Sequence, residues 1–233
     1  MEKVVYLLDA GAGMSGDDVR ERLVDDVAPR LLSAGAHQVQ VNVMDSGVEA
    51  AAGSRMRSGT GPCPDAMVSL WLDSANDPLR SAYDDVLRDV DSGVAAYLVT
   101  ESAPLPGDPV DGRRPGYTQV SFLQRPERLD EQSWLAHWHE HHTQVAIDTQ
   151  ATSRYLQNLV VRSLTPGAPP CTAVVEEAFP EAAMTDQSVF FDAVGDDARQ
   201  KANADALMAS VMAFLDFDLI DVVPTSEYTV RSK

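Results

Sequence analysis

The chain has 233 residues, 44% of them hydrophobic, which suffices for one large or two small globular domains and excludes a disordered chain. Its formal net charge of -18 argues against binding to nucleic acid or to an anionic membrane surface. Two cysteines, Cys63 and Cys171, are too few for a disulfide framework, and no apolar run reaches the roughly 20 residues of a membrane helix. We therefore expect a cytoplasmic protein.

Strand and helix patterns alternate along the first half of the chain. Period-two or short apolar runs predict strands, and apolar stripes at helical spacing predict helices. The predicted elements are strands at 4–8, 39–43, 66–72 and 94–100 and helices at 17–33 and 78–90. Their order is β-α-β-β-α-β.

Residues 104–116 are rich in proline, glycine and charge, which suits an extended linker. Beyond them the same order restarts, with strands predicted at 118–124, 154–164, 171–179 and 219–230 and helices at 130–148 and up to about 215. The repeat depends on this order and on a shared asparagine, Asn42 and Asn158. We predict an α+β protein of two tandem ferredoxin-like units, 1–103 and 117–233. Their sheets would pair face to face as a dimeric-type α/β barrel with a lined cavity.

A glycine-rich turn, Gly11-Ala12-Gly13-Met14-Ser15-Gly16, follows the first strand and opens the first helix, as a dinucleotide fingerprint would. However, Asp17 and Asp18 at the helix start would repel a pyrophosphate. Asp45 lies farther along than the ribose-binding acid should, and the next two strands follow each other without a crossover helix. We predict a turn here and no nucleotide cofactor.

Four of the five histidines fall within residues 137–142. The run His137-Trp138-His139-Glu140-His141 spells an inverted zinc-protease motif. Helical geometry projects His137 and Glu140 toward solvent, and no third ligand is evident, so we predict no metal cofactor. His137 and His141 share a helix face and could still bind a metal adventitiously.

His142 differs from the other histidines because it falls on the apolar side of the helix, one turn beyond Trp138. Burial would lower its pKa and keep it neutral, able to act as a base or hydrogen-bond donor. The competing interpretation is a core histidine satisfied by a backbone carbonyl. Because it points where a barrel cavity should lie, we predict His142 as the catalytic residue. The predicted substrate-binding residues are Trp134, Trp138, His139, Tyr155 and Gln157.

The stretch from Val120 to His142 resembles the EthD domain family, whose pattern is a strand, a basic turn and a helix with an aromatic, a Trp and a His at successive turns. Trp134, Trp138 and His142 occupy those three places, although the family's Ala-Pro-Leu after the His is replaced by residues 143–145. The resemblance is clearest over 117–179. The first half looks degenerate, with Asp26 in the place of His142. The resemblance implies a dimeric α/β barrel, here as a pseudo-dimer within one chain that could pair again as a homodimer.

The resemblance also implies a cofactor-independent enzyme of oxidoreductase or monooxygenase type. In it, His142 would exchange a proton with a small hydrophobic aromatic, polyketide or terpenoid substrate. Cyclisation or decarboxylation in the same cavity is an alternative reaction. A non-catalytic protein that binds small molecules is a second alternative, and a metal or haem site at the histidine cluster is the least favoured.

Overall fold

The computed structural model describes residues 1–9, 13–91 and 93–231. Each half of the chain forms an antiparallel sheet. Most of its strands are buried at nearly every position, because alternate residues face opposite sides of the sheet and both sides are covered. In the first half the pairing order is β2-β3-β1-β4. These strands are β1 (Glu2–Leu8), β2 (Gln38–Val43), β3 (Ala66–Leu72) and β4 (Ala95–Leu105).

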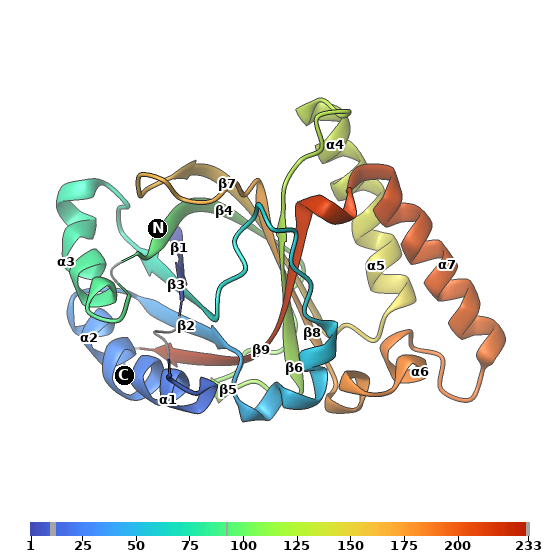
Figure 1. The fold of residues 1–233 in the computed structure, drawn as a ribbon, viewed down its shortest axis with the longest axis horizontal. Helices are drawn as coiled ribbons and strands as arrows, with labels where there is room; N and C mark the ends of the chain where they lie inside the picture. Colours follow the sequence, from blue (N-terminus) through green and yellow to red (C-terminus); the bar gives the residue numbers. More distant parts are fainter. Residues whose placement is uncertain (10–12, 92, 232–233) are drawn as a thin grey trace.

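The second half repeats this arrangement with the order β7-β8-β6-β9. Its strands are β6 (Tyr117–Leu123), β7 (Arg154–Ser163), β8 (Ala173–Phe179) and β9 (Ile220–Arg231). Pairing of β4 with β7 and of β2 with β9 joins the two sheets edge to edge into a closed eight-stranded barrel (Figure 1). The predicted tandem ferredoxin-like architecture is confirmed. The sheets meet through strand edges, which the face-to-face prediction did not anticipate.

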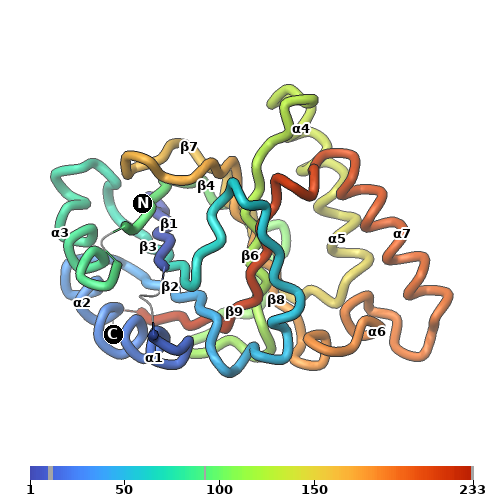
Figure 2. Tube along the Cα trace, viewed as in Figure 1, coloured from blue at the N-terminus to red at the C-terminus, as the bar shows by residue number. Residues whose placement is uncertain are grey.

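The boundary between the halves is less sharp than the sequence suggested. The first predicted unit ends at residue 103, but β4 continues to Leu105. Within the predicted linker, a short strand β5 (Gly112–Arg113) pairs with β9. Figure 2 shows the last strand running beside the first-half helices, where β9 pairs with β2.

Helices lie outside the barrel, with α1 to α3 on one side and α4 to α7 on the other (Figure 1). The first helix of each half is interrupted by a π-helical turn. In the first half the segments are α1 (Gly16–Glu21), η1 (Arg22–Val27) and α2 (Ala28–Ser33), and in the second α4 (Glu131–His137), η3 (Trp138–His142) and α5 (Thr143–Thr149). The second helices are α3 (Asp77–Arg88) and α7 (Asp197–Phe214); shorter segments are η2 (Ser46–Ser54), η4 (Glu181–Met184), α6 (Gln187–Phe190) and η5 (Phe217–Leu219). None of the helices in the described ranges is long and apolar enough to span a bilayer.

The described part of the glycine-rich turn is a helix cap. The Ser15 hydroxyl accepts from the Asp18 backbone N–H, and the Asp18 carboxylate accepts from the Ser15 N–H, which forms a capping box. A Cβ on Gly16 would lie 1.8 Å from the carbonyl oxygen of Met44, so only glycine permits this close approach. Gly11 and Ala12 lie outside the described residues.

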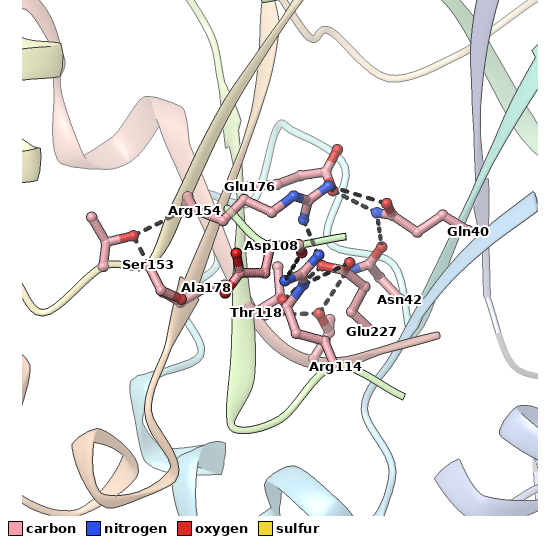
Figure 3. A network of polar contacts seen from close by, with 12 residues as sticks. Gln40, Asn42, Asp108, Arg114, Thr118, Ser153, Arg154, Glu176, Ala178 and Glu227 are labelled. Carbon is pink, nitrogen blue, oxygen red and sulfur yellow. Dashed lines mark hydrogen bonds and ion pairs between the residues drawn. The ribbon is translucent and has the colours of Figure 1, made fainter. Parts of the chain in front are cut away.

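The barrel interior is filled by side chains, including a buried ionic network around Glu176 (Figure 3). Glu176 accepts from Lys3 Nζ at 3.0 Å, from Asn158 Nδ2 at 3.0 Å and from Gln40 Nε2 at 2.5 Å. Burial alone would raise the pKa of Glu176, but Lys3 and Arg154 outweigh this effect and hold it at about 2. The network connects β1 and β2 of the first half with β7 and β8 of the second.

A second carboxylate, Glu227 on β9, extends this network to the barrel mouth. It accepts from Arg154 Nη1 at 2.6 Å, from Arg114 Nε at 2.9 Å and from the Thr118 hydroxyl at 2.9 Å (Figure 3). A cavity of about 270 Å³ remains at this mouth beneath residues 106–110. Since His142 does not line it, the prediction that His142 points into the barrel is wrong.

Candidate functional site

His142 lines a different pocket, which lies outside the barrel between the second-half sheet and its helices. The pocket has a volume of about 110 Å³. Strands β6 to β9 supply its floor, and η3 and α7 supply much of its wall. Its lining residues are Gln119, Ser121, Leu123, Trp138, His142, Gln150, Tyr155, Val175, Glu177, Leu207, Val211, Phe214, Leu215, Ile220 and Val222.

Three polar residues form a row across the pocket floor. Tyr155 on β7 is the register partner of Glu177 on β8, and Glu177 is the partner of Gln119 on β6. Directly opposed side chains on one face of a sheet lie about 5 Å apart at Cβ. The row therefore brings a carboxyl, a phenol and an amide together under the helices.

The first half of the chain shows what this row looks like without a pocket. In the same places of the pseudo-symmetric sheet, Val39 on β2 pairs with Leu70 on β3, and Leu70 pairs with Val4 on β1. All three are buried in the hydrophobic core beneath α1 to α3. The fold therefore does not require polar residues here, and the polar row is specific to the second half.

The helix above the row differs between the halves in the same way. Aligning the starts of the two interrupted helices places Val19, Leu23 and Val27 opposite Trp134, Trp138 and His142. All six are buried. The first-half counterpart of His142 is thus Val27. The expected counterpart, Asp26, is exposed.

Glu177 is the group with the most unusual environment. The residue is 7% exposed, and burial raises the pKa of its carboxyl to about 7, an effect that a hydrogen bond with Gln119 partly offsets. The Gln150 amide, with its nitrogen facing the acceptors, donates to Oε1 of Glu177 and to the carbonyl of Ala146, each at 3.2 Å. Near neutral pH this carboxyl can therefore either take or give a proton.

His142 is buried and neutral at the pocket wall, as its helix position predicted. It is 8% exposed, its Nδ1 lies 3.0 Å from the Ser210 hydroxyl, and its ring centroid lies 4.6 Å from that of Phe214. Burial, followed by the charges of His137 and His141, lowers the pKa of His142 to about 4. Its partner is a side-chain hydroxyl on α7, where the core-histidine interpretation expected a backbone carbonyl.

Two of the predicted substrate-binding residues line the pocket. Trp138 Nε1 donates to the Tyr155 hydroxyl at 3.3 Å, so these rings form a joined edge of the pocket. Burial, with a smaller effect of Glu177, raises the pKa of Tyr155 and keeps its phenol protonated.

The other three predicted residues do not line the pocket. Trp134 is fully buried behind Trp138, with ring centroids 5.1 Å apart. Gln157 donates to the Thr143 hydroxyl at 2.7 Å and so connects β7 to the helix. His139 is exposed.

Two of the remaining histidines, His137 and His141, lie side by side on the helix. The ring centroids of His137 and His141 lie 5.0 Å apart, and His137 Nε2 donates to the Ser210 carbonyl at 3.1 Å. His137 is thus half-buried against α7, where the helical projection expected solvent. Across residues 1–9, 13–91 and 93–231, no group of three or more His, Cys, Asp or Glu could hold a metal ion. Cys63 and Cys171 are free, and burial raises the pKa of Cys171 to about 12.

Glu177 was not among the predicted site residues, although the sequence carries a signal for it. Glu176 and Glu177 are adjacent within an otherwise apolar strand, Ala173–Phe179. Successive residues of a strand face opposite sides, so a strand buried on both faces must bury one carboxylate on each. Glu176 faces the barrel network and Glu177 faces the pocket.

Comparison with known proteins agrees with this architecture. Residues 126–218 match the EthD domain model, which extends beyond the clearest stretch of the resemblance to include α7. No curated protein matches the chain significantly. Among solved structures, the chain is similar to an anthrone oxidase-like protein, with 10% identity, a TM-score of 0.57, and coverage of 100% of this chain and 92% of that one.

Two further solved structures are more distant. One is a candidate monooxygenase from Lactobacillus acidophilus NCFM, with 10% identity, a TM-score of 0.49 and coverage of 97% and 93%. The other is a chlorite dismutase variant from Candidatus Nitrospira defluvii, with 11% identity, a TM-score of 0.47 and coverage of 97% and 90%. At such identities the likeness concerns the fold. The chain thus has the dimeric α/β-barrel fold within one polypeptide, and its residues 126–218 match the EthD domain model.

Proposed function

We propose that the protein is an enzyme that removes a proton from a small, largely apolar substrate, with Glu177 and His142 as its acid/base groups and without a cofactor. The observation that carries this proposal is the row Tyr155–Glu177–Gln119 in place of Val39–Leu70–Val4. Burying an ionisable carboxyl where the fold accepts leucine costs stability, and such costs are typical of functional sites.

Glu177 is the better proton acceptor of the two. With a pKa of about 7 it matches neutral pH, whereas His142, with a pKa of about 4, is a weak base there. In the proposed step the Glu177 carboxylate takes a proton from an acidic C–H or O–H, and the electron pair stays on the substrate. The neutral His142 then hydrogen-bonds the substrate oxygen on which that charge develops.

The deprotonated substrate can follow more than one path. Reaction with dioxygen would oxidise it, as in a cofactor-free monooxygenase or oxidase. Cyclisation or decarboxylation would follow from the same proton transfer without net oxidation. Dioxygen uptake during turnover separates the oxidative path from the other two.

The shared first step can be tested without knowing the final product. We expect the protein in D₂O to accelerate deuterium exchange into acetylacetone above the buffer background, measured by NMR. The rate should rise with pH through about 7, because only the ionised Glu177 accepts a proton.

The variants assign the roles. Glu177→Gln should lose the acceleration by about 100-fold or more, and His142→Ala should lose part of it. His139→Ala, which removes an exposed histidine from the same helix, is the control and should exchange as the wild type does. Exchange that survives in Glu177→Gln at the wild-type rate would show that the carboxyl is not the base.

A further inference from the structure

The pocket beneath α7 is small. Its volume is about 110 Å³. A dry cavity of about 150 Å³ holds benzene, and pockets for drug-sized ligands usually exceed roughly 300 Å³. The pocket is smaller than this benzene cavity, so one six-membered ring is the upper limit of the ligand body that it can enclose without displacement of the helix.

The pocket wall also offers no counter-ion for an anion. None of the described residues that line it is Lys or Arg, and its floor carries the Glu177 carboxyl. A carboxylate or phosphate placed there would lose its hydration and face a like charge. This excludes substrates that carry a negative charge into the pocket.

The sheet side of the pocket is mostly polar and the α7 side is apolar, with His142 at the wall between them. Tyr155, Glu177 and Gln119 form a single row on the floor, while Leu207 and Val211 on α7 face it from the opposite side. A ligand that satisfies both sides has one polar edge and an otherwise apolar body.

We propose that the substrates are neutral compounds of one ring or less with a phenolic or enolic edge, and that Leu207 and Val211 set the size limit. This inference depends on the proposed function, because the polar edge is the group that meets Glu177. Leu207 and Val211 lie one turn apart on α7 and are only partly buried, so shortening them enlarges the pocket without opening the core.

Calorimetric titration of the whole chain near pH 7 tests the proposal with three probes: 4-methylphenol, 2-naphthol and 4-hydroxybenzoate. The first matches the proposed class, the second adds a ring, and the third replaces the methyl with a carboxylate. We expect 4-methylphenol to bind about tenfold or more tightly than either of the others.

The size limit is tested with the Leu207→Ala/Val211→Ala variant, which should gain about tenfold in affinity for 2-naphthol and lose some for 4-methylphenol. Met212→Ala, which shortens a side chain on the outer face of the same helix, 60% exposed, should bind all three probes as the wild type does. Thermal unfolding confirms that both variants are folded.

Equal binding of 2-naphthol or 4-hydroxybenzoate to the wild type, or no binding of any probe, would overturn the inference. Neither result decides the proposed function, because deuterium exchange into acetylacetone is measured independently and its molecule is smaller than any probe. If the protein catalyses deuterium exchange but binds the three probes equally well, the proposed proton abstraction stands and the proposed substrate class is wrong.

Discussion

Glu177 occupies a place that the other half of the chain fills with Leu70, and ionisation there destabilises the fold. Its folded pKa of about 7 lies above its ordinary value of 4.5, so the folded state favours the neutral form. Stability due to this group is present below about pH 4.5 and is lost as the pH rises through about 7, by about 3 kcal/mol.

Glu177→Gln should therefore raise the free energy of unfolding at pH 8, while at pH 4.5 it should match the wild type. Urea denaturation at the two pH values measures this difference. Glu181→Gln, on the exposed start of η4, is the control and should show no such dependence. A Glu177→Gln effect that is equal at both pH values would place the carboxyl in solvent.

The two acid/base candidates were not equally predictable. The helical position of His142 beside Trp138 predicted its burial, which depends on local periodicity, and His142 is buried in the structure, which lowers its pKa to about 4. The role of Glu177 could be predicted only from its neighbours on β6 and β7, which lie far away in sequence. The sequence shows that a carboxyl is buried there, but only tertiary pairing shows which pocket it faces.

The π-helical turn η3 is positioned by its contact with the sheet. The Thr143 hydroxyl donates to the Trp138 carbonyl at 2.8 Å and accepts from Gln157 Nε2 at 2.7 Å. The hydroxyl thus adds a second donor, beside the Thr143 backbone N–H, to a carbonyl of the widened turn and connects the turn to β7.

Thr143→Val keeps the shape of the side chain but leaves the Trp138 carbonyl and the Gln157 amide without this partner. We expect a loss of about 1–3 kcal/mol in unfolding free energy. Binding of 4-methylphenol should also weaken, because the pocket residues Trp138 and His142 are the first and last residues of the turn. Thr149→Val is the matched control, since that hydroxyl donates to the Val145 carbonyl of its own helix at 2.7 Å and does not connect the helix to the sheet within the described residues. If both variants bind the probe equally well, the hydroxyl does not position the turn.

This turn also limited the prediction at the element scale. The apolar spacing predicted one helix over 130–148, and a regular wheel placed His137 in solvent. The turn interrupts the predicted helix after His137, whereas His137 itself is half-buried because α7 packs against the side that the wheel left open. Hydrophobic periodicity locates an element, whereas its irregularities depend on contacts with other elements.

At the scale of the whole molecule, element order predicted both ferredoxin-like halves because each helix and strand has a local pattern. Element order did not predict that the barrel closes through the pairs β4–β7 and β2–β9, because the sequence of an edge strand does not specify which strand it pairs with. The charged interior was likewise unexpected. Its residues, such as Lys3 and Arg154, alternate with apolar ones along their strands. This pattern predicts side chains that face solvent, whereas closure of the barrel buries them.

The interior network makes the two halves depend on each other. Arg154 contributes ion pairs to Glu227 at 2.6 Å and to Glu176 at 3.5 Å, and Arg154→Met would leave both buried carboxylates undercompensated. We expect a loss of about 3–5 kcal/mol in unfolding free energy. Arg30→Met, which removes an exposed pair with Asp89, should leave the free energy of unfolding nearly unchanged, because solvent screens exposed ion pairs.

Acid should act on the same network. The pKa of Glu176 is held at about 2, below its ordinary value of 4.5, so its stabilisation is present above about pH 4.5 and is lost as the pH falls through about 2. Because its partners Lys3 and Gln40 come from the first half, both halves should unfold in one transition in this window. Far-ultraviolet circular dichroism follows the helices of both halves, and Trp71 fluorescence, with Trp134 and Trp138 replaced by Phe, follows the first half alone. Separate midpoints for the two signals would show that the two halves unfold independently and that the ionic network does not couple them.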